Sequence, residues 1–444
     1  MNDVEEIQQR AEELLQDPGF LYRVSAVIGS LGVVRELRNR LIVFLATLTT
    51  MFHNPVSVLV KGRSSSGKSN LLRAVLKILP RLMVIERSGM SPKALIFGEE
   101  KLDGRVLYIQ EVRAVAVAQM LLRLIQSEGS LTYERTSMSG PEPGTRVKRR
   151  VGSPVVLTTT TDDRIFEDDE TRFLSVWADE SAEQTHQILR AKLHTESQVD
   201  RVELAAVQLA VRVLLDQKVK VSLPSWLETV LDHMPGDVRT RRDATSVLNI
   251  LRAIALTRYF RSGSPKRRKM EVDFSDYAVA WCLLNDALTH STSDLPIATG
   301  QVIKAAEAVF GKSHKSVSAD EIAIQLGWKK ATVYRHLNSA MELGLLSHDG
   351  KSRPNNEKRF TPTGVKRNDF LLSPQKLLEI CPQLQGCKYV DPITGNNVVV
   401  TREQRTAASN KVRRPGGLKP KWERLHLSTR GAGQHAAGVR LTRK

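Results

Sequence analysis

The sequence predicts an α/β fold built on a parallel sheet, because short apolar segments of strand type alternate with helical segments between residues 53 and 182. Parallel strands need crossover connections, which are usually helices, so this alternation indicates a sheet covered by helices on both faces. The expected strands are 56–60, 82–86, 106–110, 155–159 and 173–177, and the expected helices between them are 68–79, 92–97 and 114–127.

The rest of the chain divides into segments of different character, as expected for 444 residues, which are too many for one compact core. The pattern turns almost wholly helical after residue 183, and a smaller unit follows. The predicted division is an N-terminal helical segment at 1–52, an α/β core at 53–182, a helical lid at 183–295, a small unit at 300–365 and a basic, largely disordered tail at 366–444.

Positive charge is concentrated at the C-terminus. The formal net charge is +18, and residues 401–444 contain twelve Lys or Arg against two Glu. Such a segment is attracted to polyanions through counterion release, although it could also serve only to keep the chain soluble. The sequence has no apolar run of about 18 residues that could cross a bilayer, and it has only three cysteines. A cytoplasmic location without membrane contact is therefore expected.

A phosphate-binding loop is predicted at residues 62–69, which read Gly-Arg-Ser-Ser-Ser-Gly-Lys-Ser between an apolar strand and a helix. The glycines let the backbone curl so that its N–H groups point at a phosphate, and the helix adds its positive end. Lys68 would reach the β- and γ-phosphates, and Ser69 would ligate Mg²⁺. ATP and Mg²⁺ are the expected ligands, since the guanine-reading Asn-Lys-x-Asp motif is missing. The expected nucleotide contacts are Gly62, Ser64, Ser65, Ser66, Gly67, Lys68 and Ser69.

The strand at 106–110 ends in Gln110 and Glu111, at the sheet edge where α/β folds bind ligands. Glu111 is placed to orient and deprotonate the attacking water. Gln110 stands where an Asp usually holds the Mg²⁺ shell, and a neutral amide can hydrogen-bond a metal-bound water but supplies no charge. Either slow hydrolysis or help from a neighbouring group is therefore expected. The alternative is an ordinary strand that ends in a solvated Glu.

A third strand ends in a run of threonines at 158–161. A hydroxyl at this strand tip, from Thr159 or Thr160, could polarise the same water, as a sensor 1 residue does. Threonine is also a common strand residue, so a purely structural role is the alternative.

Together, these motifs resemble the AAA+-type, superfamily 3-like helicase modules of primase–helicase and replication proteins encoded by bacterial mobile elements and prophages. The resemblance covers roughly residues 10–260, and the motifs that carry it are 58–70, 90–95, 127–130, 158–161 and 170–174. It implies an oligomeric ATPase, with a hexamer expected, that moves on single-stranded DNA in a central channel. Primase activity is not implied.

The resemblance also implies an arginine finger before the fifth strand, which would act on a neighbour's γ-phosphate. Arg172 fits that place, and Arg164 is the reserve candidate. A surface ion pair of Arg172 with Glu167 or Asp169 is the alternative.

In the helical lid, one arginine at the head of a long helix could act as sensor 2 on the nucleotide. The candidates are Arg239, Arg241 and Arg242, of which Arg241 is taken.

Residues 131–150 are predicted to form a β-hairpin around the turn Gly-Pro-Glu-Pro-Gly at 140–144. In the helicases that the chain resembles, a hairpin just before sensor 1 enters the channel and grips the DNA backbone. A solvated basic edge is the alternative. The expected phosphate contacts are Arg146, Lys148, Arg149 and Arg150.

The small unit contains a capped helix at 318–327, a second helix from Lys329, and short strands around the loop 348–358. This pattern resembles a winged helix-turn-helix domain, whose second helix reads the major groove of duplex DNA. Lys329, Lys330 and Arg335 are the expected DNA contacts, together with Thr332, Tyr334 and His336. Winged helices also bind proteins, and Tyr334 and His336 could instead pack within the unit.

The sequence therefore predicts an ATP-dependent DNA motor, such as an oligomeric replicative helicase or initiator of a mobile genetic element. One alternative is a regulator in which ATP switches a winged-helix DNA-binding domain. Another is a protein-remodelling or defence ATPase whose basic parts contact RNA or a protein partner.

Overall fold

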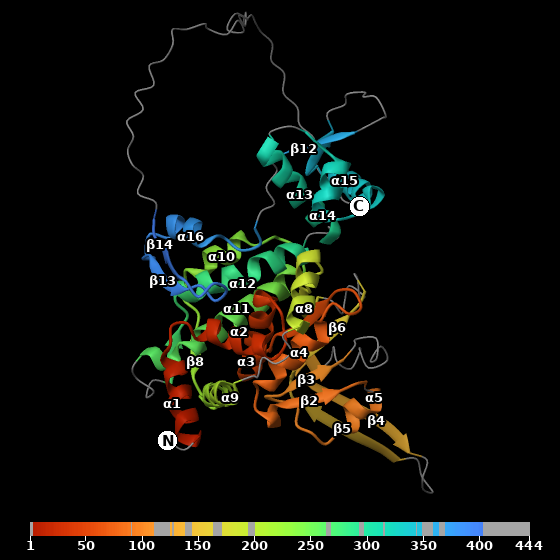
Figure 1. Ribbon diagram of the computed structural model, residues 1–444. Helices are drawn as coiled ribbons and strands as arrows, with labels where there is room; N and C mark the ends of the chain where they lie inside the picture. Colours follow the sequence, from red (N-terminus) through yellow and green to blue (C-terminus); the bar gives the residue numbers. More distant parts are fainter. Residues whose placement is uncertain are drawn as a thin grey trace, which may run out of the picture. The chain divides into compact units, whose positions relative to one another are not determined.

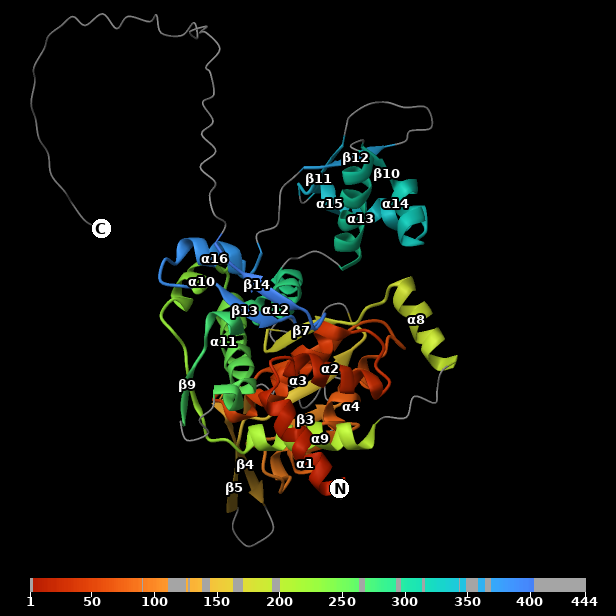
Figure 2. The same ribbon diagram turned by 60° about the vertical axis from the view of Figure 1, so that its left-hand side comes forward.

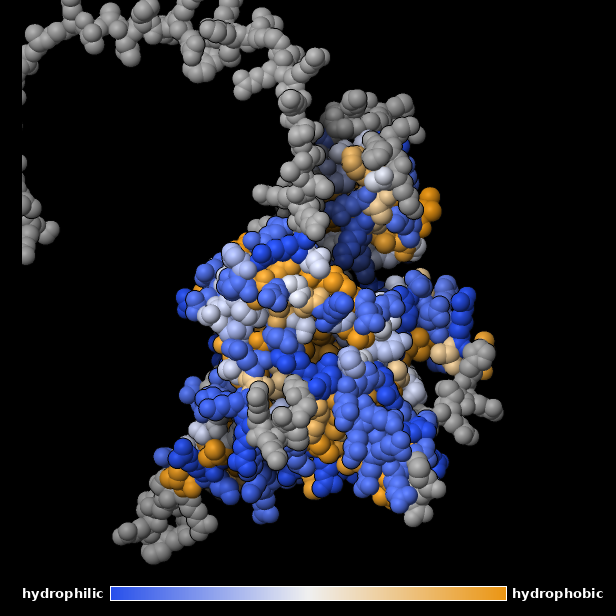
Figure 3. Space-filling view, turned by 90° about the vertical axis from the view of Figure 1, so that its left-hand side faces the viewer, coloured by the Kyte–Doolittle hydropathy of each residue, from blue (hydrophilic) through white to orange (hydrophobic). Residues whose placement is uncertain are grey.

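The computed structural model describes most of the chain up to residue 402 (Figure 1). The described residues are 3–89, 91–110, 125–126, 128–137, 144–162, 171–193, 200–262, 268–292, 297–313, 316–342, 344–348, 358–363 and 369–402. Charged and polar side chains dominate the face drawn in Figure 3, where apolar side chains form only limited patches. Among these residues no helix has the length and apolar character needed to cross a membrane.

A five-stranded parallel sheet forms the centre of the fold, which confirms the predicted α/β class. Its strands are β1 (Ser57–Lys61), β2 (Val84–Arg87), β3 (Val106–Ile109), β6 (Val155–Thr160) and β7 (Phe173–Trp177). Their order across the sheet is β2-β3-β6-β1-β7. β1 thus lies between two strands that follow it in the sequence, and the segment after β1 emerges at a switch point of the topology, where α/β sheets bind ligands.

Both faces of the sheet are covered, as predicted, because successive strand residues point to opposite sides. Val58 and Val60 of β1 belong to the larger core, while Leu59 belongs to the smaller one. Helices that contribute to the larger core include α1 (Asp3–Gln16), α2 (Phe20–Ser30), α3 (Leu37–Leu48) and α4 (Lys68–Lys77). The smaller core contains Leu95 and Ile96 of α5 (Pro92–Phe97).

The N-terminal segment is joined to the helical region rather than separate from it. Arg10 of α1 pairs with Asp200 at 3.3 Å, and Arg23 of α2 pairs with Glu203 at 2.8 Å. The helical region contains α8 (Ala182–Leu193), α9 (Arg201–Leu215), α10 (Leu227–His233), α11 (Thr240–Thr257) and α12 (Phe274–Thr292), with β8 (Lys220–Ser222) parallel to β9 (Lys269–Glu271).

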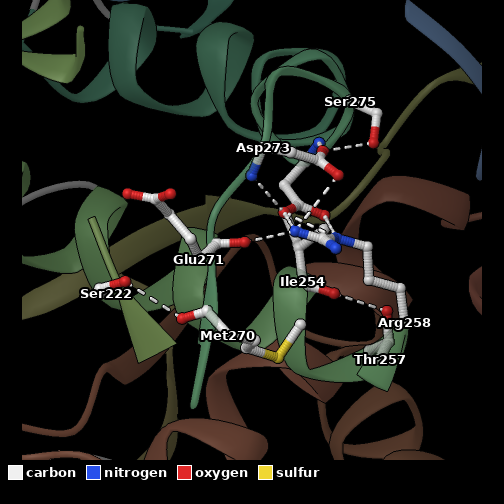
Figure 4. Close-up of polar contacts among 9 residues, drawn as sticks. Ser222, Ile254, Thr257, Arg258, Met270, Glu271, Asp273 and Ser275 are labelled. Atoms are coloured by element: carbon white, nitrogen blue, oxygen red, sulfur yellow. Dashed lines mark hydrogen bonds and ion pairs between the residues drawn. The ribbon is translucent and has the colours of Figure 1, made fainter. Parts of the chain in front are cut away.

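A buried ion pair fastens the end of α11 to the start of α12 (Figure 4). The Arg258 guanidinium lies 3.0 Å from Asp276 and 3.2 Å from Asp273, and it also donates to the carbonyl of Glu271. Burial raises the pKa of Asp276 to about 6, although the hydrogen bonds from Arg258 oppose this shift. Removing one partner of such a pair costs about 3–5 kcal/mol, because the other charge is left buried.

Residues 297–363, here called the small unit, have a core of their own. The unit contains α13 (Ile297–Ser313), β10 (Val317–Ser318), α14 (Ala319–Leu326), α15 (Lys330–Glu342), β11 (Leu346–His348) and β12 (Arg359–Pro362). Its three strands form an antiparallel sheet in the order β10-β12-β11. Ser318 and Glu321 form a capping box at the start of α14, and Gly327 ends that helix with a positive φ of 66°. Val333, Leu337 and Phe360 are fully buried in this core.

The predicted tail begins too early, because residues 369–402 are folded onto the helical region. This returning segment contains α16 (Pro374–Ile380) and the antiparallel strands β13 (Cys387–Val390) and β14 (Asn397–Val400). Phe370, Leu371 and Leu377 join the larger core. These apolar residues precede the strongly basic stretch, and the basic composition obscured them in the sequence. Residues 403–444 lie outside the described part of the chain.

The small unit is an insertion, since the chain leaves α12 and returns beside the same helix. Asn285 of α12 donates to the Asp369 carboxylate at 3.1 Å and accepts from the Leu371 N–H at 3.0 Å. The Thr289 hydroxyl accepts from the Phe370 N–H at 3.1 Å. Both connections to the small unit therefore start from one end of α12.

We expect the returning segment to be necessary for stability, while the residues after it are not. A chain that ends at residue 368 should be destabilised by several kcal/mol, because burying each large apolar side chain contributes about 1.5–3 kcal/mol. A chain that ends at Arg402 keeps the hydrogen bonds from its guanidinium to the carbonyls of Leu378 and Cys381 and should melt like the full chain. Thermal unfolding of the two truncations measures the difference. Equal melting temperatures of the two truncated chains would contradict the conclusion that residues 369–402 stabilise the fold.

Candidate nucleotide-binding site

The loop after β1 has the geometry that a phosphate cradle needs. Gly62, Ser65 and Gly67 have positive φ angles of 150°, 66° and 89°, so the backbone turns sharply before α4 begins. A Cβ atom at Gly62 would lie 2.9 Å from Ser66 Oγ and 3.0 Å from a Glu180 carboxylate oxygen. Only glycine fits at this position without displacing its neighbours.

Lys68, the first residue of α4, is buried and folds back over the loop. Its ammonium donates to the carbonyls of Gly62 and Arg63 at 2.7 and 2.5 Å. A phosphate oxygen above the loop would offer this ammonium a charged acceptor in place of two neutral ones, and charge-assisted hydrogen bonds are about twice as strong. The arrangement therefore fits an anionic ligand.

Glu180 forms a wall of the loop that sequence reasoning missed. The Ala178 N–H donates to the Lys61 carbonyl at 2.9 Å, which continues the pairing of β7 with β1. Glu180 then accepts a hydrogen bond from the backbone N–H of Arg63 and lies 3.4 Å from the Arg63 guanidinium. Only the pairing of β1 with β7 reveals this contact, and no local sequence signal marks it.

Gln110, Thr159 and Thr160 lie at the same sheet edge as the loop. The Thr159 hydroxyl donates to the Gln110 carbonyl at 2.5 Å, and Thr160 is paired with Lys61 in the sheet register. The structure thus brings together three of the predicted site residues from the ends of two strands, β3 and β6. Glu111 follows Gln110 directly but lies outside the described residues.

The site fits a Mg²⁺ ion that is shared with a nucleotide. No group of three His, Cys, Asp or Glu side chains that could hold a metal exists within the described ranges. Mg²⁺ is commonly bound by one or two protein ligands together with substrate phosphates. Ser69 lies in the first turn of α4, near the buried Tyr108 hydroxyl of β3. Burial raises the pKa of Tyr108, and a hydrogen bond with Ser69 opposes that rise.

Arg172 lies at the opposite edge of the sheet. It precedes Phe173, which pairs with Ser57 at the start of β1, whereas the phosphate loop follows Lys61 at the end of that strand. Four strand residues span about 13 Å, so Arg172 is remote from the loop of its own chain. Arg164, Glu167 and Asp169 lie outside the described residues.

The predicted sensor 2 contact of Arg241 with its own nucleotide is not supported. Its neighbour Arg242 donates to the Thr171 hydroxyl, which places the start of α11 beside Arg172 and away from the phosphate loop. Arg241 itself is exposed there. Arg239 instead faces the buried Asp243 at 3.5 Å, and burial raises the pKa of that carboxyl to about 6. The direction in which α11 runs past the sheet decides where Arg241 lies, and the sequence does not reveal that direction.

The predicted hairpin is present as β4 (Ser130–Ser137) paired with β5 (Gly144–Val151), and it projects from the sheet (Figure 1). Lys148 and Arg149 are exposed, and as strand neighbours they point to opposite faces of the hairpin. The side chain of Arg146 is outside the described part.

Arg150 corrects the predicted set of DNA contacts. Its side chain is buried at the base of the hairpin, where it donates to the carbonyl of Gly98 and, at 2.7 Å, to that of Glu100. Burial lowers the pKa of the guanidinium. Arg150 therefore anchors the hairpin and is not available to bind phosphate.

In the small unit, the predicted basic residues lie on the surface of α15 and just before it. Lys329, Lys330 and Arg335 are exposed, and Lys330 forms an ion pair with Asp320 at 2.6 Å. His336 and Tyr334 instead pack internally. A ring nitrogen of His336 lies 2.9 Å from the Thr299 hydroxyl, and the Tyr334 ring packs edge-on against Phe360.

Comparison with known families identifies a P-loop domain. A family model described as the MTBMA_p00010 P-loop domain matches residues 5–215, slightly less than half of the chain. No curated protein matches.

Among solved structures, the chain is similar to a full-length MCM homolog from Methanopyrus kandleri, at 17% identity and a TM-score of 0.41. The match covers 64% of this chain and 61% of that protein, less than two thirds of its length. A second structure is titled SCCmec type IV Cch, active helicase, with 14% identity, a TM-score of 0.32, and 73% and 66% of the two chains covered. A third is the NrS-1 C-terminal region, with 13% identity, a TM-score of 0.25, and coverage of 77% and 75%. TM-scores below 0.5 carry no further conclusion about this chain.

We expect Arg150→Ala to loosen the hairpin, because it leaves the carbonyls of Gly98 and Glu100 without their donor. The free energy of unfolding should fall by about 2 kcal/mol, the usual contribution of hydrogen bonds made by a charged group. The exposed neighbour Arg149 supplies the control, since Arg149→Ala should change stability by less than about 0.5 kcal/mol. Chemical denaturation measures both variants. Equal effects would show that Arg150 does not anchor the hairpin.

Proposed function

We propose that the chain is an ATP-dependent DNA motor that works as an oligomer, as a replicative helicase or initiator of a mobile genetic element. The observation that carries this proposal is the convergence of the phosphate loop, Gln110 and Thr159 at one edge of the parallel sheet. A cradle for phosphates beside a polar strand tip is the arrangement that nucleotide hydrolysis requires. The family match to a P-loop domain supports it.

In the proposed reaction, the backbone of residues 62–69 holds the β- and γ-phosphates of ATP, and Lys68 transfers its hydrogen bonds from the loop carbonyls to phosphate oxygens. Glu111 orients the attacking water and takes its proton, and Thr159 and Gln110 position that water from the neighbouring strand ends. Bound Mg²⁺, held by Ser69, would neutralise charge on the phosphates. Because Gln110 adds no charge to that shell, hydrolysis should be slow.

Arg172 is proposed to act on the nucleotide of an adjacent subunit. Its place at the amino edge of the sheet keeps it away from its own phosphate loop, so it can serve only a neighbour. Arg242 and Arg241 at the start of α11 lie beside it and belong to the same proposed contact. A head-to-tail arrangement of this kind closes into a ring, for which six subunits are proposed.

The DNA contacts are proposed to be divided between two places. Lys148 and Arg149 on the projecting hairpin would bind the phosphates of single-stranded DNA, which carry no sequence information. The small unit is proposed to be a winged helix, in which Lys329 and Arg335 would face the major groove of duplex DNA. The ion pair of Lys330 with Asp320 would have to open before Lys330 could contribute.

A second candidate is an ATP-switched DNA-binding regulator without motor activity. The observation that favours it is the double attachment of the small unit to α12, which links a DNA-binding unit to the helical region at Asn285 and Thr289. Strand displacement distinguishes the two candidates, because a regulator would bind DNA in response to ATP but would not unwind it.

Two substitutions should separate nucleotide binding from hydrolysis. Lys68→Ala should weaken ATP binding, since it removes the only lysine in the loop, whereas Glu111→Gln should bind ATP and hydrolyse it at least about 100-fold more slowly, as the loss of a general base predicts. Nucleotide affinity, DNA-stimulated ATPase activity and strand displacement would be measured for each. If Glu111→Gln hydrolyses ATP at the parent rate, another residue is the base.

Mixing two inactive proteins tests the action of Arg172 in trans. Arg172→Ala should bind ATP but lose hydrolysis, because transition-state charge is no longer neutralised by the neighbour. Adding Lys68→Ala protein, which keeps Arg172, should restore part of the activity in mixed assemblies. The control is a chain that carries both Lys68→Ala and Arg172→Ala. Adding this double variant to Arg172→Ala protein should restore no activity. If the first mixture restores no activity, Arg172 is not the arginine finger.

A further inference from the structure

The first turn of helix α8 fixes the helix to the core. The Ser181 hydroxyl accepts from the Gln184 N–H at 3.1 Å and caps the helix. Glu183 pairs with Arg35 at 2.8 Å, and the Gln184 side chain donates to the Val34 carbonyl at 2.9 Å. Gln184 is the one buried residue of α8, and Figure 2 shows the rest of the helix standing out from the core.

The free part of α8 carries an apolar stripe. Leu189 is 53% exposed and Leu193 is 82% exposed, and residues four apart lie on the same side of a helix. A helix of 12 residues is marginal in water on its own, because most helical stability in proteins comes from packing of an apolar face. In the second half of α8, Ile188 is half-buried, whereas the described part of the chain leaves Leu189 and Leu193 exposed. Arg190 is exposed beside the stripe.

A second unpartnered surface lies at α10 and the turn that leads to α11. Leu231 is 37% exposed and Val238 is 75% exposed. Glu228 and Asp232, one helical turn apart on α10, are exposed and acidic. This surface adjoins the start of α11, where Arg242 contacts Thr171 next to Arg172.

Arg190 beside the α8 stripe is opposite in charge to Glu228 and Asp232 on α10, but the two surfaces lie on opposite sides of the core. In Figure 2, α8 lies on the right of the core and α10 on the left. One chain cannot bring them together, whereas two copies in head-to-tail contact can, because such a contact joins different patches of identical subunits. The basic residue beside the α8 stripe would then meet the acidic pair on α10.

We propose that α8 of one copy docks on the surface formed by α10 and the start of α11 of the next copy, with Leu189 and Leu193 packed against Leu231 and Val238. α8 begins directly after Glu180, which lines the phosphate loop, and the receiving surface adjoins Arg172. The same contact therefore brings the Arg172 edge of one copy toward the nucleotide of another. The proposal rests on the proposed function for its head-to-tail arrangement and adds the surfaces that would form it.

The test compares leucines of similar exposure on the full chain. Leu189→Ser combined with Leu193→Ser should weaken self-association at least about tenfold in sedimentation with a non-hydrolysable ATP analogue. Leu82→Ser removes a leucine that is also 82% exposed but lies elsewhere, and it should leave association unchanged. Nucleotide affinity and melting temperature should be those of the parent in both variants, because neither leucine of α8 supports the core.

A charge exchange identifies the receiving surface. Arg190→Asp alone should weaken association, and Asp232→Arg in the same chain should restore it, since every interface then carries the reversed pair. A parent chain that stays monomeric with the ATP analogue and DNA, or a serine variant that assembles like the parent, would overturn the docking proposal. A parent chain that stays monomeric would also contradict the oligomeric arrangement of the proposed function, whereas a serine variant that assembles like the parent would contradict the docking surface alone. ATP binding that still depends on Lys68 would leave the nucleotide site intact in either case.

Discussion

The pairing of β1 with β6 on one side and β7 on the other is the constraint on which the nucleotide site depends. Hydrogen bonds along both edges hold β1 in the middle of the sheet, and its last residue, Lys61, is in register with Thr160 and Trp177. The phosphate loop therefore starts between two fixed strand ends. Ser65 has a positive φ of 66°, which is strained for a residue other than glycine and persists only where its surroundings determine it. Glu180 and Lys68 both form hydrogen bonds with the backbone of this loop.

The parallel sheet has two edges with different surroundings. Residues that directly follow the strands lie near the phosphate loop, and residues that directly precede the strands lie at the far edge, a strand length away. Arg172 and Arg242 belong to the second group. If these arginines act on a phosphate, as we propose, the direction of the strands makes that phosphate one bound by a neighbouring chain.

Sequence patterns predicted the parts of this protein that depend on local periodicity. The alternating strands and helices, the phosphate loop and the hairpin follow from side-chain order alone, and the structure contains them. The helix predicted at 114–127 lies mostly outside the described residues. The patterns did not predict which charged residues are buried. Arg150 looks like its neighbours Lys148 and Arg149, but a single position of strand register points it at the carbonyls of Gly98 and Glu100. Sequence patterns also missed Glu180, because the pairing of β1 with β7 places it beside the phosphate loop.

The insertion of the small unit has a consequence for synthesis on the ribosome. The Tyr277 hydroxyl donates to the Leu372 carbonyl at 2.5 Å, so a buried group of α12 finds its acceptor 95 residues later in the chain. At roughly 5–20 residues per second, translation of the intervening stretch takes on the order of 5–20 s. During that interval the small unit can already fold on its own core, while the apolar side of α12 waits uncovered. A nascent chain of this protein would thus complete its inserted domain before its host domain, and the exposed helix would be the segment that a ribosome-bound chaperone meets.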